Sequence, residues 1–298
     1  MGYYTSAYSI MEIKNNHKNF IDYLKELGRP NTTVIAYSKD IDQLLSHLEA
    51  RGILETAQIE LNHLAEYIED LKKNNYTLKS ISRKINSIKT YFKFLENKGF
   101  IKINPSKDLK HPKLESKAPR VLSRLEYGAL RDACREDIRT LAMVETLLQT
   151  GIRISELSEL RLDEVELSGT SPKISLPKKN AIPARDIPLN KAVINALNKY
   201  LEERPNVSSH FFFVTKSGNP ILVRNIRSSI DRYFDLAGIK DAKVNDLRHT
   251  FVSFHLQNGA NIQHLSRISG HKRLSTTEKY LGLIESPKNS DSTELNIL

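Results

Sequence analysis

The chain has 298 residues, enough for roughly two domains of ordinary size. Its 45 lysines and arginines exceed its 35 aspartates and glutamates, which gives a formal net charge of +10. This surplus favours a polyanionic partner, although a plain soluble basic protein has the same balance. A single cysteine, Cys134, excludes an internal disulfide framework and zinc sites built from several cysteines. No apolar run approaches about 18 residues and the first residues do not resemble a secretory signal, so we expect a cytoplasmic protein without a membrane partner.

The first hundred residues predict an all-helical domain over 1–105. Apolar residues recur there at three- and four-residue spacing, which is typical of amphipathic helices. Gly, Asn and Pro separate the segments at positions where helices commonly end. The expected helices lie near 11–27, 32–50, 60–74 and 78–97.

The helix expected near 78–97 concentrates positive charge on one face. Residues 77–98 contain six basic residues and one acid, a net charge of 6 − 1 = +5. Opposite its apolar stripe lie Lys79, Arg83, Asn86, Thr90 and Lys93. Such a face can donate hydrogen bonds to phosphates and base edges, and we interpret all of these residues except Thr90 as candidate nucleic-acid contacts. The alternative is an ordinary solvated helix face.

Residues 106–120 predict a basic interdomain linker, because this stretch is rich in proline, carries five basic and two acidic residues and has little hydrophobic pattern. The second domain, expected over 121–283, is mixed. Residues 173–189 predict a β-hairpin, and 210–215 a further buried strand. Helices are expected near 124–135, 138–150, 190–203, 224–237, 246–258, 261–268 and 276–283.

The predicted fold class is therefore mainly α, with a small β-hairpin or sheet in the second domain: an all-helical N-terminal domain followed by a mixed α+β domain. Residues 284–298 predict a polar tail with an apolar end, formed by Leu295, Ile297 and Leu298.

Several kinds of catalytic site have no signature in the sequence. It contains no G-x-x-x-x-G-K-[ST] loop, no G-x-S-x-G elbow and no H-E-x-x-H motif. Acids and histidines do not cluster in a metal-ligand pattern. We therefore expect no cofactor, neither a nucleotide nor a metal.

The second domain nevertheless carries the groups that metal-free phosphoryl transfer needs: Arg153, Arg248, His271 and Tyr280. Arginine forks neutralise the oxygens of a phosphate and of its transition state. A tyrosine hydroxyl can attack phosphorus and form a phosphotyrosyl ester, and a histidine can donate a hydrogen bond or move a proton.

Local patterns predict how these groups are presented. Gly151 can take the left-handed conformation that ends a helix, which places Arg153 in the turn before the next helix. Asn245 and Arg248 share one helix face at three-residue spacing. Residues 275–278 predict a capping box that starts a helix carrying Tyr280 in its first turns.

Taken in order, three spans resemble the tyrosine recombinase family, and most closely its Xer branch. They are residues 150–160 (TGIRISELSEL), 245–251 (NDLRHTF) and 268–280 (ISGHKRLSTTEKY). The resemblance covers nearly the whole chain. It implies a core-binding helical domain and a catalytic domain that clamp double-stranded DNA at a specific recombination site. It also implies strand exchange within a homo-tetramer through a 3′-phosphotyrosyl link, without metal or ATP.

The resemblance assigns roles to residues of this chain. Tyr280 corresponds to the nucleophile, Arg153 and Arg248 to the phosphate clamps, and His271 to a hydrogen-bond donor and proton handler. Glu156 corresponds to the family's supporting acid. The C-terminal segment of the family docks onto a neighbouring subunit, a role that the apolar end of this tail would take.

The family's catalytic lysine lies in a β-hairpin and protonates the leaving 5′-oxygen. Here the hairpin offers Lys178 and Lys179, and the strand pattern favours Lys178 over its neighbour. The turn departs from the family's usual Gly-Lys-Gly and is longer by a few residues.

A second departure concerns Asn245, which stands where the family has the histidine of its His-x-x-Arg motif. Asparagine can donate a hydrogen bond to a phosphate oxygen but cannot shuttle a proton. We expect Asn245 to keep a phosphate contact and the chain to lose acid–base work there. His249 is expected to point about 100° away along the helix and not to substitute.

The sequence thus predicts a site-specific DNA recombinase, with Xer-like resolution of chromosome or plasmid dimers favoured over integration. Two alternatives stay open: a catalytically weak or inactive DNA-binding protein of the same fold, and a type IB topoisomerase.

Overall fold

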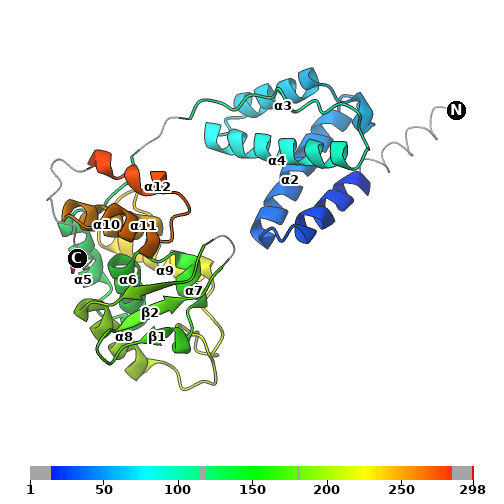
Figure 1. Ribbon diagram of the computed structural model, residues 1–298. Helices are drawn as coiled ribbons and strands as arrows, with labels where there is room; N and C mark the ends of the chain where they lie inside the picture. Colours follow the sequence, from blue (N-terminus) through cyan, green and yellow to red (C-terminus); the bar gives the residue numbers. More distant parts are fainter. Residues whose placement is uncertain (1–14, 115–117, 180–181, 284–296) are drawn as a thin grey trace. The chain divides into compact units, whose positions relative to one another are not determined.

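The structure, a computed structural model, describes residues 15–114, 118–179, 182–283 and 297–298. It divides into two compact units, Met1–Ser116 and Lys117–Leu298 (Figure 1). The division falls inside the stretch 106–120 that the sequence predicts as a linker.

The N-terminal unit is built from helices that enclose one apolar core. They cover residues 15–26, α2 (Asn31–Glu49), α3 (Leu61–Lys73) and α4 (Leu78–Asn97), with a 3₁₀ turn η1 (Thr56–Gln58) between α2 and α3. The Thr77 hydroxyl accepts a hydrogen bond from the Ser80 amide at 3.2 Å and so caps α4. The apolar stripe of α4 is buried against its neighbours and orients the opposite, polar face outward.

The first residues of the predicted linker pack against α4. Leu109 belongs to the apolar core of this unit. Lys107 pairs with Glu96 of α4 at 2.7 Å, and the Ser82 hydroxyl lies 3.1 Å from the His111 ring. Residues up to about 111 are therefore anchored to the helical unit, because one leucine reaches its core and polar side chains bond to α4.

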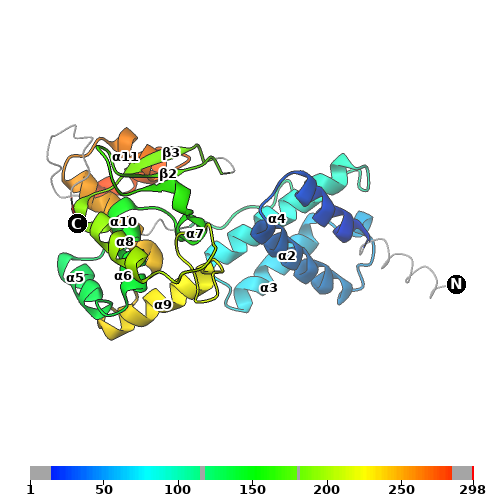
Figure 2. The same cartoon turned by 90° about the horizontal axis from the view of Figure 1, so that it is seen from below.

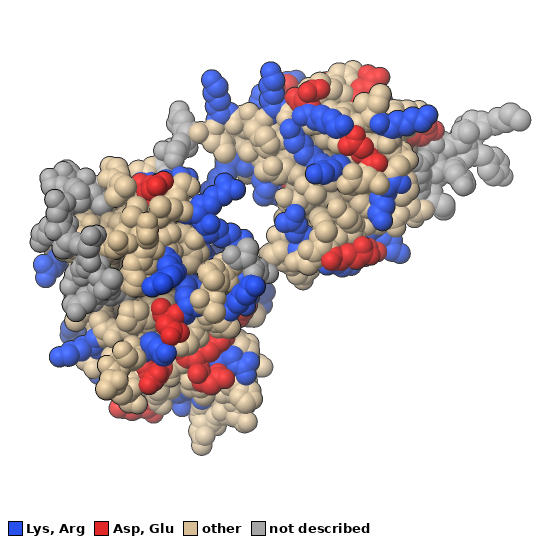
Figure 3. All heavy atoms as spheres, in the orientation of Figure 1, with Lys and Arg blue, Asp and Glu red and all other residues tan. Residues whose placement is uncertain are grey.

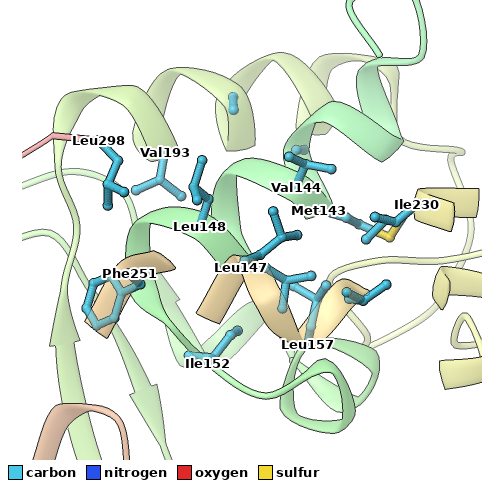
Figure 4. Close-up of a cluster of buried hydrophobic side chains, with 14 of the residues drawn as sticks. Met143, Val144, Leu147, Leu148, Ile152, Leu157, Val193, Ile230, Phe251 and Leu298 are labelled. Carbon is cyan, nitrogen blue, oxygen red and sulfur yellow. The ribbon is translucent and has the colours of Figure 1, made fainter. Parts of the chain in front are cut away.

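The second unit is organised around α6 (Ile138–Thr150), which is buried along most of its length. Asp137 caps this helix, accepting a hydrogen bond from the Thr140 amide at 3.0 Å. Leucines of α6 pack against neighbouring helices, as the close-up in Figure 4 shows. The surrounding helices are α5 (Arg124–Ala133), α7 (Ile154–Glu159), α8 (Lys191–Glu203), α9 (Val223–Leu236), α10 (Val244–Gln257), α11 (Ile262–Ile268) and α12 (Ser275–Glu278).

A small antiparallel sheet completes this unit, in the order β1–β2–β3. Its strands are β1 (Val165–Glu166), β2 (Lys173–Leu176) and β3 (Arg185–Pro188), with a 3₁₀ turn η2 (Leu162–Glu164) before β1. In the β2–β3 pair Ile174 lies opposite Ile187, which puts both on the buried face. β3 packs against α11 (Figure 2). The predicted mainly helical fold with a small hairpin is confirmed.

Two predicted elements differ from the structure. Residues 210–215 do not form a strand: Phe212 and Phe213 are buried, but only isolated bridges pair this segment, at Phe211 and Val214. The run of aromatic residues reflects burial under α8 and not sheet pairing.

The helix expected over 276–283 is also wrong in extent. α12 ends at Glu278, and a turn and the 3₁₀ segment η3 (Leu281–Leu283) follow it. The predicted capping box is absent among the described contacts of α12, because Leu274 at the N-cap already has helical dihedrals. Tyr280 therefore lies in a turn, not in the first turns of a helix.

Candidate active site

The turn between α6 and α7 positions Arg153. Gly151 ends α6 with φ +61°, and a Cβ there would lie 2.3 Å from Cδ1 of Phe251, so only glycine fits. Arg153 begins α7 as its N-cap. Its amide donates to Glu156 Oε2 at 2.7 Å, and its Nη2 donates to the Gly270 carbonyl at 2.5 Å. Its Nη1 donates to Glu156 as well, so the guanidinium is held by Gly270 on one nitrogen and by Glu156 on the other.

Arg248, in α10, is buried against backbone carbonyls. Its Nη1 donates to the Gly151 carbonyl and its Nη2 to the Ser269 carbonyl, the latter at 2.5 Å. Burial, followed by the nearby charge of Arg153, lowers the pKa of Arg248 to about 10, so the guanidinium is still charged at neutral pH. It forms no ion pair with a carboxylate of the described residues, and its positive charge is available to an anion.

A third arginine, Arg185, joins this group, although it belongs to none of the sequence motifs. It opens β3 and is buried, with its Nε donating to the Ile268 carbonyl at 2.7 Å. Its Nη2 contacts both carboxylate oxygens of Glu156, at 2.9 and 2.8 Å. The available signal was the strand alternation, which puts Arg185 on the same inward face as Ile187.

Two of the three guanidinium groups share one carboxylate, that of Glu156, while Arg248 bonds to backbone carbonyls. Glu156 bonds to Arg185 and, at 3.3 Å, to Nη1 of Arg153. Gly270 permits this crowding: a Cβ there would lie 2.9 Å from Cζ of Arg185 and 3.0 Å from Nη1 of Arg153. Its φ of +64° also favours glycine. The net positive charge of this cluster is what a phosphodiester in a low-dielectric site requires.

His271 follows Gly270 and is held by α12. Its Nδ1 lies 2.7 Å from the hydroxyl of Thr277. Burial, reinforced by the charge of Arg248, lowers the pKa of His271 to about 3, so its ring is neutral at physiological pH. When the Thr277 hydroxyl donates to Nδ1, the hydrogen of the ring lies on Nε2, which is then a neutral hydrogen-bond donor.

Tyr280 is buried in the turn after α12. Its ring stacks with that of His271, with centroids 6.5 Å apart and planes 13° from parallel. Burial raises the pKa of the Tyr280 hydroxyl, while the charge of Arg248 opposes this shift. The hydroxyl lies 2.5 Å from Nδ1 of His249.

The contact between Tyr280 and His249 corrects the expectation that His249 points away from the site. His249 does lie on a different face of α10 from Arg248. However, η3 packs against α10, and the turn just before η3, which carries Tyr280, therefore covers the face on which His249 lies. The other ring nitrogen, Nε2, lies 2.8 Å from the side-chain amide of Asn245, one helical turn earlier. Asn245 itself is exposed.

The two hairpin lysines differ in their surroundings. Lys179 pairs with Glu159 and forms a bridge with Ile182. Lys178 is exposed and makes no ion pair or hydrogen bond with the residues that the structure describes. The amine of Lys178 is therefore free to approach a ligand, whereas that of Lys179 is engaged.

The four candidate contacts on α4 are exposed: Lys79, Arg83, Asn86 and Lys93. Arg83 is partly committed to the fold, because its Nη1 bonds to the buried carboxylate of Asp40 on α2. In the space-filling view of Figure 3, Lys and Arg side chains are spread over the surface of this unit, with acidic side chains between them.

The apolar end of the tail lies on its own unit. Leu298 is buried beside Val193 and Phe251 (Figure 4), and its carbonyl accepts a hydrogen bond from Arg131 at 2.9 Å. Ile297 is exposed, and Leu295 lies outside the described residues.

The described residues contain neither a metal-binding cluster nor a membrane-spanning helix. No group of three or more His, Cys, Asp or Glu side chains is arranged there to hold a metal ion. Among the same residues, no helix has the length and apolar character to cross a membrane.

Comparison with known proteins identifies the family. Residues 120–285 match the phage integrase family, and residues 18–99 match the phage integrase N-terminal SAM-like domain. A relative, tyrosine recombinase XerC of Staphylococcus epidermidis, is 31% identical over 271 residues, which are 88% of this chain and 87% of the relative. This chain is a tyrosine recombinase. Its similarity to Xer proteins puts it in the Xer-like branch, and it is a site-specific DNA recombinase.

Solved structures agree on the fold. The Tn1549 transposon integrase in complex with transposon right end DNA has a TM-score of 0.74 at 17% identity, over 89% of this chain and 94% of that one. A lambda integrase dimer bound to a COC′ core site has a TM-score of 0.72 at 14% identity, over 96% and 79% of the two chains.

Proposed function

We propose that this recombinase cuts DNA with Tyr280 as its nucleophile, in the site formed by Arg153, Arg248 and His271. The observation that carries the proposal is the stacking of the buried Tyr280 ring on His271, within reach of the charge of Arg248. Arg153, Arg185 and the one carboxylate of Glu156 complete a cluster with net positive charge. Attack of the tyrosine oxygen forms an O–P bond and breaks the bond from phosphorus to the 5′-oxygen. The products are a 3′-phosphotyrosyl link and a free 5′-hydroxyl.

Each neighbouring group has a part in this step. The guanidiniums of Arg153 and Arg248 bind the nonbridging oxygens, whose negative charge grows as the transition state forms. The neutral ring of His271 donates from Nε2 to the same phosphate. Glu156 and Arg185 do not bind substrate; they fix Arg153, to which Glu156 bonds directly.

The lysine that protonates the leaving 5′-oxygen is Lys178. Its freedom from other partners supports this choice over Lys179, which pairs with Glu159. Asn245 adds a phosphate contact through its side-chain N–H, since its side chain is exposed next to His249, one helical turn from the buried Arg248.

The substrate is double-stranded DNA carrying a specific recombination site, and the exposed basic face of α4 contacts it. The solved relatives bound to transposon DNA and, as a dimer, to a core site support DNA binding and assembly. Paired cleavage and exchange of strands at two sites takes four subunits, so the active species is a homo-tetramer on DNA. The Xer-like sequence favours resolution of chromosome or plasmid dimers, a reaction of the cytoplasm that serves chromosome partition at cell division.

A suicide substrate tests the catalytic assignment. A nick just 3′ of the scissile phosphate releases a short fragment after attack, so religation fails and the protein stays joined to DNA. Candidate sites are the repeats of the host genome. Wild type forms an adduct that maps to Tyr280, and Tyr280→Phe forms none. An equal yield from Tyr280→Phe, or no adduct from wild type at any site, contradicts the assignment.

Two readouts separate the related functions. Salt-sensitive DNA binding without any adduct would indicate a non-catalytic DNA-binding protein of the same fold. Relaxation of a supercoiled plasmid that lacks a recombination site would indicate a type IB topoisomerase. Resolution of a plasmid only when it carries two sites is the result that we expect.

A further inference from the structure

Three side chains form a line into the active site: Asn245, His249 and Tyr280. The amide of Asn245 lies 2.8 Å from Nε2 of His249, and Nδ1 of the same ring lies 2.5 Å from the Tyr280 hydroxyl. Asn245 and His249 are four residues apart on α10, so their contact is built into one rigid helix. The imidazole thus has one nitrogen on the nucleophile and the other on a fixed amide.

Asn245 stands where the family has a histidine, so another side chain of this line must accept the proton of Tyr280. An amide does not titrate near neutral pH, so position 245 can take no proton from the nucleophile. His249 is a titratable group whose nitrogen already contacts the reacting oxygen. Proximity of this kind is the first requirement of a general base.

We propose that His249 is the general base that deprotonates Tyr280, and that Asn245 is the positioning residue that orients its ring. This inference rests on the proposed role of Tyr280 as the nucleophile. The arrangement has the logic of a catalytic triad, in which a third polar group selects the tautomer of the histidine.

The amide of Asn245 controls which nitrogen carries the hydrogen. When its Nδ2 donates to Nε2, the neutral ring holds its hydrogen on Nδ1 and donates to the tyrosine oxygen. Rotation of the amide by 180° places Oδ1 there instead, and Nε2–H then donates to it. Nδ1 is now an acceptor for the Tyr280 O–H. The amide N–H groups of Asn245 also turn outward, where they can reach a phosphate.

The charges around His249 suit a base. Asp246 on its own helix raises the pKa of His249, whereas Arg248 lowers it, and His271 is the facing histidine from the loop after α11. Burial is the largest cause, and the net effect lowers the pKa of His249 from 6.5. The ring is therefore neutral at neutral pH and can accept a proton.

The step balances within the site. The Tyr280 proton moves to Nδ1 of His249, and the tyrosine oxygen forms its bond to phosphorus. The bond to the 5′-oxygen breaks, and that oxygen takes a proton from Lys178. The resulting imidazolium donates from Nε2 to Oδ1 of Asn245. In religation, Nδ1 returns its proton to the departing tyrosine oxygen.

Single-turnover cleavage of the suicide substrate, measured against pH, tests the proposal. Wild-type cleavage falls as the pH drops through the pKa of His249, below 6.5. His249→Gln keeps a polar side chain but cannot titrate, so we expect cleavage about 10²- to 10³-fold slower with that acid limb removed. His210→Gln, at an exposed histidine of the same unit, serves as the matched control and behaves like wild type.

A substrate with sulfur in place of the bridging 5′-oxygen distinguishes a base from an acid. A thiolate leaves without protonation, so this substrate restores cleavage by Lys178→Ala. It does not restore His249→Gln, because the tyrosine still has to lose its proton. Restoration of His249→Gln to the rate of Lys178→Ala overturns the base role.

Asn245→Asp tests the positioning role at an exposed residue whose replacement does not threaten folding. A carboxylate beside Nε2 stabilises the imidazolium and raises the pKa of His249, so the acid limb moves to higher pH. An unmoved limb contradicts the proposal, and so does cleavage by His249→Gln within about threefold of wild type. Failure of wild type itself to form an adduct instead removes the proposed function of Tyr280, and the base role with it.

Discussion

The two units bury a cation in opposite ways. In the helical unit, Lys84 of α4 is buried with its ammonium 2.9 Å from the carboxylate of Asp40, which also accepts from Ser87. In the catalytic unit, Arg248 is equally buried but bonds to the backbone carbonyls of Gly151 and Ser269. The first charge is neutralised within the fold, whereas the second is only partly compensated.

We propose that this difference separates a cation that stabilises the fold, Lys84, from one that binds substrate, Arg248. A carboxylate cancels the field of a buried lysine and leaves nothing for a ligand. Carbonyl dipoles satisfy the hydrogen-bond donors of a guanidinium while its net charge persists, and a phosphate can supply the missing anion. The neighbours of Arg248 are also incompletely neutralised, because Arg153 and Arg185 share the single carboxylate of Glu156.

Removal of the structural cation has the largest expected effect on stability. Lys84→Met leaves Asp40 buried with only the half-exposed Arg83 as a counter-charge, and we expect about 3 kcal/mol lower free energy of unfolding. Chemical denaturation of the full chain measures it. Lys93→Met, at an exposed lysine of the same helix, changes it by less than about 0.5 kcal/mol. Equal losses from the two variants contradict the structural role of Lys84.

The close approach at Gly270 predicts an effect on catalysis. The methyl group in Gly270→Ala displaces Arg153 and Arg185 and also strains a backbone with φ +64°. We expect suicide-substrate cleavage about 10- to 100-fold slower, with DNA affinity little changed. Gly238→Ala is the control for backbone strain alone, because φ there is +68° and no atom lies within 4 Å of the added methyl group. Equal cleavage by both variants argues against crowding.

Buried His255 predicts a loss of stability in acid. It packs between Phe251 and Phe254, neither ring nitrogen has a partner within the described residues, and burial lowers its pKa to about 4. The unfolded chain therefore binds the extra proton between pH 6.5 and 4, and the free energy of unfolding falls as pH falls.

His255→Phe removes this contribution. Over that window wild type should lose about 1 kcal/mol more per pH unit than the variant, as measured by denaturation at several pH values. Parallel pH profiles for the two proteins contradict a neutral, buried His255.

The exposed face of α4 predicts the smallest effect. Lys79→Ala and Lys93→Ala each remove one cation that the fold does not use, so affinity for DNA falls and the slope of log Kd against log salt drops by about 1 per contact. Titration at several salt concentrations measures the slope. An unchanged slope would mean that these lysines do not contact DNA and are ordinary solvent-exposed residues. Arg83 is unsuited to this test because it also bonds to Asp40.

Much of the fold was predictable because local signals and burial agree. The spacing of apolar residues predicts α2, α3, α4 and α6 within one or two residues, and Gly151 correctly ends α6. The prediction failed where tertiary contacts decide. Phe212 is buried without strand pairing, and the turn that carries Tyr280 forms where a helix was expected.

The same limit applies to the site. Motif order predicted the residues around Arg248 that the structure brings together, but Arg185 has no motif and is identified by its inward position on β3. The prediction for His249 was wrong because helical periodicity gives the direction of a side chain on its own helix but not which other segment packs against it. The turn at Tyr280 supplies that second partner.

We propose that Arg248 is buried to bind a phosphate and not to stabilise the fold. Arg248→Met, compared with Lys84→Met in one thermal-melting experiment and one suicide-substrate assay, tests it most directly. We expect Arg248→Met to melt within a few degrees of wild type and to form adduct at least about 10²-fold more slowly. Lys84→Met should melt at a much lower temperature and, while folded, cleave like wild type. A low melting temperature for Arg248→Met, with adduct still formed by its folded fraction, would contradict it.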